Sequence, residues 1–388
     1  MKLKEITVKK LSLAYFFLMP GLGYGILTSR MPALKEQINA NEPDIGFLLL
    51  CFGIAGITSL TLSSVLLKFL KVTTLLKLAM LLFAFSMTML GMSKTVINAA
   101  IYIVLTGLAF GIVDVCINIL GVRLEKYFNV LCMGVLHSAY SIGGLLGSLL
   151  GSFFAFFTLS LFSNYIIVFS IYLILSIFAL PNLLKAKSAD DTPVKPVKKG
   201  FNFLKYMPFF IIFLGLINSI SFAIEGSIAE WGSILLHEEK NASQSLSALL
   251  YASMCLSTTA TRLMIDKIRS RFKDSTLILS GTIIIALAAA IGLYTHNPII
   301  SLIAFCFMGV GLAPISPILF SCAGRQKNIS AESATSIVAA ISYSGMLFFP
   351  PLIGFLANLY TLGTALNIVF AFTFVIALGA LVIRKKEN

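Results

Sequence analysis

The chain has 388 residues, of which 58% are hydrophobic and 12% charged, and its mean hydropathy is +0.96. Soluble domains are roughly 45–50% apolar and about 25% charged, so this composition excludes an ordinary soluble fold and predicts a membrane protein. The formal net charge is +13. A nucleic-acid partner is not expected, because the basic residues are spread over seven short segments between apolar runs and do not gather on one soluble face.

Apolar runs of about 18 residues or more recur along the chain, and each is long enough to cross a hydrocarbon core of about 30 Å as a helix. The first run is expected to remain as a span, because it is long and lacks a small-residue cleavage pattern. The pattern predicts an all-α membrane protein with twelve transmembrane helices, at 12–30, 45–67, 74–92, 96–121, 131–156, 162–180, 207–232, 245–265, 275–293, 298–319, 333–356 and 364–383.

The orientation follows from the basic residues, because positively charged loops are retained on the cytoplasmic side of a membrane. If the amino terminus lies in the cytoplasm, the Lys and Arg residues lie in or beside cytoplasmic loops, with four exceptions: Arg30, Lys35, Lys94 and Lys240. We therefore expect a multi-pass protein in a lipid bilayer with both termini in the cytoplasm.

The sequence lacks the motifs that several other classes of protein require. The six cysteines lie in or beside predicted spans without CxxC spacing, so neither disulfides nor a metal site are expected. ATP-driven pumping is not supported, because no GxxxxGK[ST] phosphate cradle occurs, and an intramembrane enzyme is disfavoured because HExxH and GxSxG are absent. A channel would repeat its polar groups as a ring, whereas the acids here are single. No cofactor is expected.

A charged, proline-bearing stretch at 182–206 divides six predicted spans from six and is typical of a linker. It separates a predicted amino-terminal bundle, 1–181, from a carboxy-terminal bundle, 207–388. The halves share a faint similarity at an offset of 203 residues, as in Tyr140–Ser141 and Tyr343–Ser344. Two such pseudo-symmetric halves are the layout of the major facilitator transporters.

Six groups of residues carry a more specific resemblance. They are TSRMP (28–32), DVCIN with GVRLE (114–118 and 121–125), LHSAYSIGGLLGS (136–148), EGSIAEW (225–231), GLAPISPILFSCAGRQ (311–326) and PPLIGFLA (350–357). Together they resemble a bacterial branch of the major facilitator superfamily that includes the YbjJ-type inner-membrane proteins and lies near the fucose permeases. The resemblance implies a secondary transporter of the bacterial inner membrane that works by alternating access, with a monomer as the usual state.

Asp114 lies about midway through the fourth predicted span, with Asn118 one helical turn later. Fucose permeases carry this same acid and Asn, implicated in sugar and proton handling, but they also use an acid in span 1 that this chain lacks. Placing an Asp at mid-helix costs about 2.5–3.5 kcal/mol, which favours a functional, inward-facing group. One proton moving through about 100 mV supplies about 2.3 kcal/mol, enough for on the order of 50-fold accumulation of a neutral solute. The alternative is a structural Asp satisfied by Asn118 or a neighbouring helix.

In span 7, Asn218 and Glu225 are spaced to share one helix face. Glu225 is the second proton-coupling candidate. The other residues predicted to bind substrate are Tyr24, Arg30, Asn118, His137, Tyr140, Asn218, Glu230, Trp231 and Tyr343. Three of these residues have a specific alternative role. In that case Arg30 would extend to the membrane interface, His137 would be a structural histidine with its hydrogen bonds satisfied, and Trp231 would be an interfacial anchor.

The segment TRLMIDKIRSRF (261–272) corresponds to the charged loop signature of the superfamily. It predicts a gate on the inner face formed by Arg262, Asp266 and Arg269, in which Asp266 accepts from neighbouring Arg side chains or lies at a helix N-terminus. A charged, solvated turn is the alternative.

The direction of transport is predicted from two absences. Drug/proton antiporters of the superfamily typically carry an Arg in span 4 and a Gly-Pro signature in span 5, and neither occurs here. This favours proton-coupled symport of a small polar solute, either sugar-like or an organic acid. The alternatives are proton-driven export of a metabolite or drug, and a receptor-like protein that transports nothing.

Overall fold

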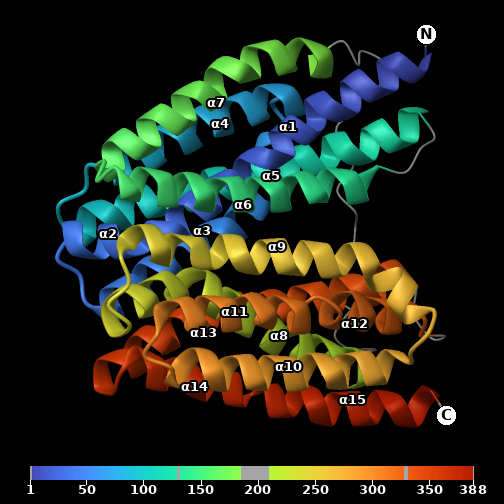
Figure 1. Cartoon of the computed structure of the whole chain (residues 1–388). Helices are drawn as coiled ribbons and strands as arrows, with labels where there is room; N and C mark the ends of the chain where they lie inside the picture. Colours follow the sequence, from blue (N-terminus) through green and yellow to red (C-terminus); the bar gives the residue numbers. More distant parts are fainter. Residues whose placement is uncertain (1, 129–131, 185–208, 327–330, 388) are drawn as a thin grey trace. The chain divides into compact units, whose positions relative to one another are not determined.

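The computed structural model describes residues 2–128, 132–184, 209–326 and 331–387, and these residues are almost entirely helical (Figure 1). The elements are α1 (Lys2–Ser29), α2 (Met31–Gln37), α3 (Glu42–Leu66), α4 (Val72–Leu90), α5 (Val96–Phe128), α6 (Met133–Phe156), α7 (Leu161–Leu184), α8 (Phe209–Ile234), the π-helical turn η2 (Leu235–Glu239), α9 (Gln244–Arg269), α10 (Asp274–Tyr294), α11 (Pro298–Leu312), α12 (Ile315–Gly324), α13 (Ala331–Leu359), α14 (Leu362–Ala371) and α15 (Thr373–Glu387).

Among the residues that the structure describes, twelve helical stretches are long and apolar enough to cross a membrane, and each overlaps one predicted span. The all-α, twelve-span fold class is therefore confirmed. Two spans are interrupted. Pro314 separates α11 from α12, since it has no backbone N–H to continue the ladder of α11, and Phe372 separates α14 from α15.

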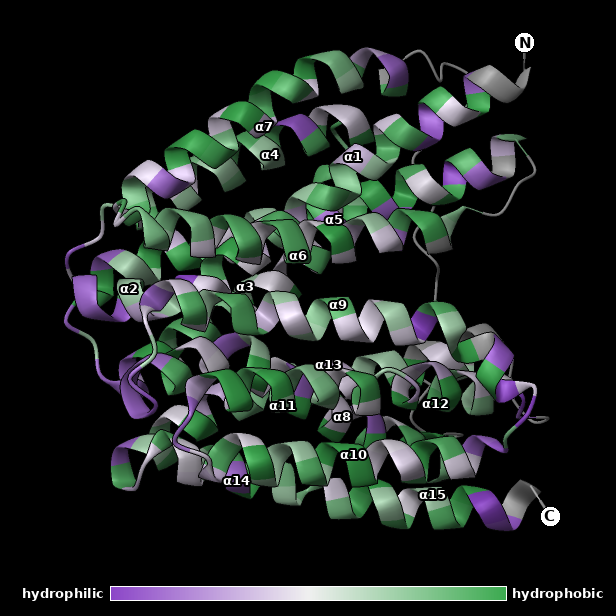
Figure 2. Ribbon diagram, in the orientation of Figure 1, coloured by the Kyte–Doolittle hydropathy of each residue, from purple (hydrophilic) through white to green (hydrophobic). Residues whose placement is uncertain are grey.

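The outer surfaces of the helices are apolar, as membrane lipid requires. Large side chains such as Phe69, Phe209 and Leu263 are mostly exposed, and hydrophilic residues gather toward the helix ends and connections (Figure 2). Exposed apolar area on this scale is not found on soluble monomers, so the surface is one that faces acyl chains.

The helices group into two compact units. The first contains residues 1–44 and 48–197, and the second contains 45–47 and 198–388. The first unit thus holds α1 to α7, except for three residues of α3, and the second holds α8 to α15. The predicted linker at 182–206 falls almost wholly outside the described residues, because α7 ends at Leu184 and the description resumes at Phe209.

In the first unit, α1 and α6 pack backbone to backbone. A Cβ added at Gly21 would lie 2.0 Å from the carbonyl oxygen of Tyr140, and one added at Gly147 would lie 2.2 Å from that of Leu22. A Cβ at Gly143 would meet the backbone oxygen of Leu18 in the same way, while one at Gly151 would meet the side chain of Ser29. Only glycine fits at these positions, so the glycines of the sixth helix serve close packing.

The second unit repeats this arrangement. A Cβ at Gly345 of α13 would lie 2.1 Å from the carbonyl oxygen of Ser219 on α8. Helices α8 and α13 are the first and fifth spans of their half, as α1 and α6 are of theirs. The two units therefore use the same helix pair for their tightest backbone contact, as expected of a repeated six-helix plan.

We predict that Gly147→Ala destabilises the protein, whereas Gly56→Ala does not. A Cβ at Gly56 meets nothing within 4 Å, while the one at Gly147 collides with a backbone oxygen. Both variants gain the same helix propensity. The difference between their stabilities therefore measures the collision alone, which costs roughly 1–3 kcal/mol. Thermal unfolding in detergent measures this difference. Equal melting temperatures would contradict the packing argument.

Candidate functional site

The acid of the fourth span is hydrogen-bonded as the sequence suggested. The Asn118 side-chain amide donates to the Asp114 backbone oxygen at 2.8 Å and to Asp114 Oδ1 at 3.1 Å. Both side chains are half-buried on α5. The bond satisfies part of the carboxylate and leaves the group accessible.

His137 extends this polar group onto a second helix. It projects from α6, lies within electrostatic range of Asp114 and is exposed. Its ring also meets that of Phe17 edge-on, at a centroid distance of 5.4 Å. Three predicted residues thus come together in the first unit: Asp114, Asn118 and His137. Exposed ionisable groups within a span face water or protein and not acyl chains.

The two tyrosines of the first unit lie on the closely packed pair α1 and α6. Tyr24 is buried, with its ring centroid 6.5 Å from that of Phe52, and Tyr140 is half-buried. Tyr24 is therefore part of an aromatic layer between α1 and α3. The role of both tyrosines in substrate binding stays a prediction.

Arg30 is only 4% exposed, and its guanidinium donates to the backbone oxygen of Leu159 at 3.0 Å. It does not extend outward as the interfacial alternative requires. Burial lowers the pKa of Arg30, while Tyr165 and Glu36 oppose that change electrostatically. Arg30 ties the end of α1 to the α6–α7 connection and offers little surface to a substrate.

In the second unit, Glu225 of α8 faces Arg262 of α9, with 3.8 Å between Glu225 Oε2 and Arg262 Nη2. Both side chains are about one third exposed, at 34% and 38%. Cys255, also on α9, interacts electrostatically with both residues. Arg262, which the sequence placed in a gate, therefore belongs with the second proton-coupling candidate.

Asn218 is fully buried and joins three helices. It donates to Ser342 Oγ at 2.8 Å and accepts from Ser316 Oγ at 2.5 Å, which connects α8 to α13 and α12. The side chain is closed to solvent in this structure, and its role in substrate binding stays a prediction. The sequence pattern placed Asn218 on an inward face correctly, but it did not reveal that neighbouring serines occupy the amide.

Near the other end of α8, Trp231 is 0% exposed and Glu230 is buried. An interfacial anchor would have to reach the membrane surface, so that alternative for Trp231 is wrong. The indole N–H has no hydrogen-bond acceptor among the described residues. Tyr343 of α13 is exposed, with its ring centroid 5.8 Å from that of Phe222.

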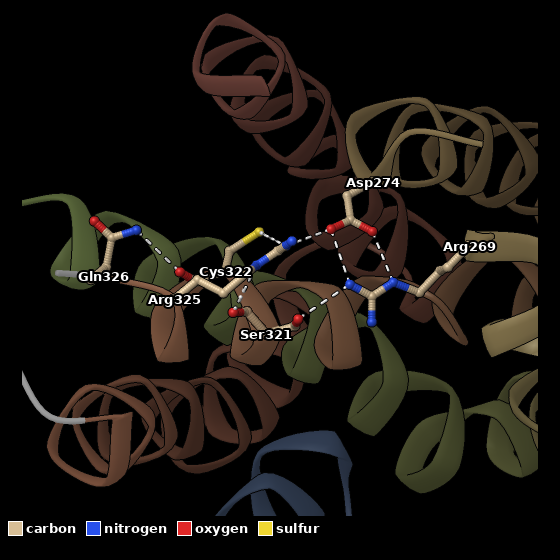
Figure 3. Close-up of polar contacts among 6 residues, drawn as sticks. All are labelled: Arg269, Asp274, Ser321, Cys322, Arg325 and Gln326. Carbon is tan, nitrogen blue, oxygen red and sulfur yellow. Dashed lines mark hydrogen bonds and ion pairs between the residues drawn. The ribbon is translucent and has the colours of Figure 1, made fainter. Parts of the chain in front are cut away.

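A charged cluster closes the end of the second unit where α9 ends, α10 begins and α12 ends (Figure 3). Arg269 donates to Asp274 through Nε at 2.8 Å and Nη2 at 3.0 Å, and Arg325 Nη2 donates to Asp274 Oδ2 at 2.6 Å. Arg269 also reaches Ser321 Oγ at 3.2 Å. Hydrogen bonding to Asp274 raises the pKa of both arginines.

The cluster contains one residue of the predicted gate, Arg269, and the gate itself stays a prediction. The carboxylate bound by Arg269 is Asp274, five residues further on, while the side chain of Asp266 lies outside the described residues. Asp274 occupies the first turn of α10, where a negative charge is favoured by the helix dipole. The sequence feature that could have predicted this contact is the position of Asp274, which begins an apolar run directly after a basic segment.

Within the described residues, no group of three or more His, Cys, Asp or Glu side chains is arranged to hold a metal ion.

Twelve spans in two helical units, with ionisable side chains held at membrane depth, define a multi-pass membrane transport protein. The family model of the Major Facilitator Superfamily matches residues 11–328, and the chain belongs to that superfamily. It is accordingly a transporter and not an enzyme.

The chain is similar to known transporters over nearly its whole length. It is 29% identical over 367 residues to an uncharacterized MFS-type transporter of Yersinia pestis, covering 94% of this chain and 93% of that one. The solved structure of the nucleoside transporter NupG superposes with a TM-score of 0.79 at 15% identity, covering 97% of this chain and 99% of that one. A D-xylose-proton symporter superposes with a TM-score of 0.67 at 15% identity, covering 95% and 97%.

These comparisons confirm the superfamily predicted from the sequence. The likeness to the two solved structures shows the shared fold, because the identities are low. The finer expectation, a YbjJ-type branch near the fucose permeases, stays a prediction.

We predict that Asp274→Asn lowers stability by about 1–3 kcal/mol. The change leaves two guanidinium groups without their carboxylate, and the usual 3–5 kcal/mol for a buried pair is reduced because Arg325 is largely exposed. Asp44→Asn is the matched control, since Asp44 also lies in the first turn of a helix but forms a capping box without an Arg partner. Thermal melts of both variants in detergent test this, and equal losses would show that the cluster adds nothing beyond capping.

Proposed function

We propose that the protein is a proton-coupled symporter that takes up a small polar solute by alternating access, with Asp114 as the proton carrier. In this proposal it lies in the bacterial inner membrane as a monomer, with both termini in the cytoplasm. The observation that carries the proposal is the accessible Asp114 carboxylate within a membrane span, hydrogen-bonded to Asn118 and near His137.

The arrangement suits reversible protonation. The Asn118 amide donates to the ionised form of Asp114, and a positive His137 would favour the same form. Removal from water favours the neutral form, so the state of Asp114 depends on whether the site is wet or closed. A transport cycle requires this dependence, because the proton must be bound on one side of the membrane and released on the other.

The solute class follows from the polar groups around Asp114. Amide and imidazole side chains are donors and acceptors suited to hydroxyl and carbonyl groups. The solved structures of similar fold include a nucleoside transporter and a sugar-proton symporter. Both observations support a hydroxyl-bearing solute such as a sugar, a sugar acid or a nucleoside.

We predict that Asp114→Asn abolishes accumulation against a gradient while leaving exchange of solute across the membrane. Asn preserves the size and the hydrogen bond to Asn118 but cannot carry a proton. The measurement is uptake of labelled sugars, sugar acids and nucleosides into proteoliposomes with an imposed pH gradient, acidic outside. Concentrative uptake should fall at least tenfold.

The control is Glu238→Gln, the same chemical change at an exposed carboxylate near the end of the seventh span. It should transport normally. Full, pH-dependent accumulation by Asp114→Asn would remove Asp114 from the mechanism. Solute extrusion driven by an inward proton gradient would favour export over uptake.

A further inference from the structure

The contact between Glu225 and Arg262 is loose for an ion pair within a membrane protein. The distance of 3.8 Å is longer than a hydrogen bond, which usually spans 2.7–3.2 Å. Arg262 Nε is buried and has no acceptor among the described residues. The guanidinium therefore has hydrogen-bonding capacity that Glu225 does not use.

Both side chains belong to spans, Glu225 to 209–239 and Arg262 to 244–265. Charged groups that are one third exposed at this depth face water, because exposure to acyl chains would be costly. There is also free space at this turn of α8. A Cβ added at the buried Gly226, next to Glu225, would meet nothing within 4 Å.

Two other arginines of the described residues form shorter contacts. Arg30 is 4% exposed and holds the Leu159 carbonyl oxygen, and Arg269 makes a two-point contact with Asp274. Arg262 combines access to water, an unused N–H and a carboxylate beyond hydrogen-bonding distance. These are the properties of a guanidinium ready to accept a second anion.

We propose that Arg262 binds a carboxylate group of the transported solute and that Glu225 is the counterion which this carboxylate displaces. The inference rests on the proposed transport function and narrows its substrate class to organic acids. A guanidinium presents paired N–H groups in the geometry of a carboxylate, which makes a two-point contact with the solute possible.

The exchange balances in charge. Before binding, Arg262 and Glu225 together are neutral. When the solute carboxylate takes the guanidinium, Glu225 loses its cation and accepts a proton, so the site remains neutral with anion and proton both bound. Solute and proton thus enter together, and each favours binding of the other.

The surroundings of Glu225 contain few other titratable groups that would take over this role. Cys255, hydrogen-bonded to Tyr251 on the same helix, interacts electrostatically with Glu225 and Arg262. On α13, packed against α8, Tyr343 contacts Phe222 one turn before Glu225. These thiol and phenol groups stay neutral near pH 7 in ordinary surroundings, so Glu225 is the acid that responds to the solute.

The test measures binding of matched acid and neutral probes to the full-length protein in lipid nanodiscs by equilibrium dialysis. The pairs are gluconate with glucitol, glucuronate with glucose, and lactate with 1,2-propanediol, each differing mainly in the carboxylate. At least one acid should bind tenfold or more tightly than its neutral partner. Arg262→Gln should remove that preference, Arg262→Lys should retain part of it, and Arg271→Gln, an exposed arginine outside the spans, should leave it unchanged.

The variant Glu225→Gln distinguishes a counterion from a merely structural residue, because only the loss of a counterion would change the affinity for acids and its pH dependence. Without the competing carboxylate, the acid should bind at least threefold more tightly, and its affinity should become independent of pH between 5.5 and 7.5. Wild-type binding should strengthen toward the acidic end of that range. Size-exclusion profiles show which variants are folded, and Arg262→Lys and Glu225→Gln carry the test if Arg262→Gln does not fold.

The inference is overturned if every acid binds no better than its neutral partner, or if Arg262→Gln weakens acids and neutral probes alike. Proton-driven uptake of a neutral probe that depends on Asp114 would then leave the proposed symport intact. Selective binding of acids without any proton-driven flux would support the anion site at Arg262 and would contradict the proposed symport.

Discussion

The close approach of α1 to α6 is the constraint on which the first unit depends. Inside a membrane, lipid tails solvate apolar side chains as well as a neighbouring helix does, so association relies on packing and on polar contacts between helices. The glycines at 21, 143 and 147 allow backbone atoms to meet where any other residue would collide. This contact fixes the register of α6, and with it the position of His137 relative to the acid on α5.

The charged residues of the spans divide into two groups with different consequences. Arg269, Asp274 and Arg325 satisfy one another through short hydrogen bonds and hold the ends of three helices together. Asp114 and Glu225 are accessible and only partly satisfied. A charge in a membrane protein is retained despite its cost because it either fixes the structure or changes state during function. The first group fits the former role, and the second group has the exposure that the latter requires.

The sequence predicts contacts between residues that are close along the chain better than contacts between separate helices. The twelve spans follow from local hydropathy, and the bond between Asp114 and Asn118 follows from helical spacing within one element. The contact of Glu225 with Arg262 joins separate helices, so a linear pattern assigned Arg262 to the loop signature nearest to it in sequence. Asn218 and Trp231 show the same limit, since hydrogen bonding by Ser316 and Ser342, and complete burial, are decided by tertiary packing.

The two accessible carboxylates have partners of different charge, and this difference suggests a division of labour. Asp114 is bonded to a neutral amide and lies within electrostatic range of His137, so its protonation would respond to the wetness of its surroundings and to the pH of the compartment that reaches it. Glu225 faces a cation, so its protonation responds to whatever competes for that cation. One acid would then report the proton gradient and the other the presence of solute. A carrier that changed conformation only when both acids were protonated with solute bound, or when both were ionised with the site empty, would move neither species alone, which is the condition for tight coupling.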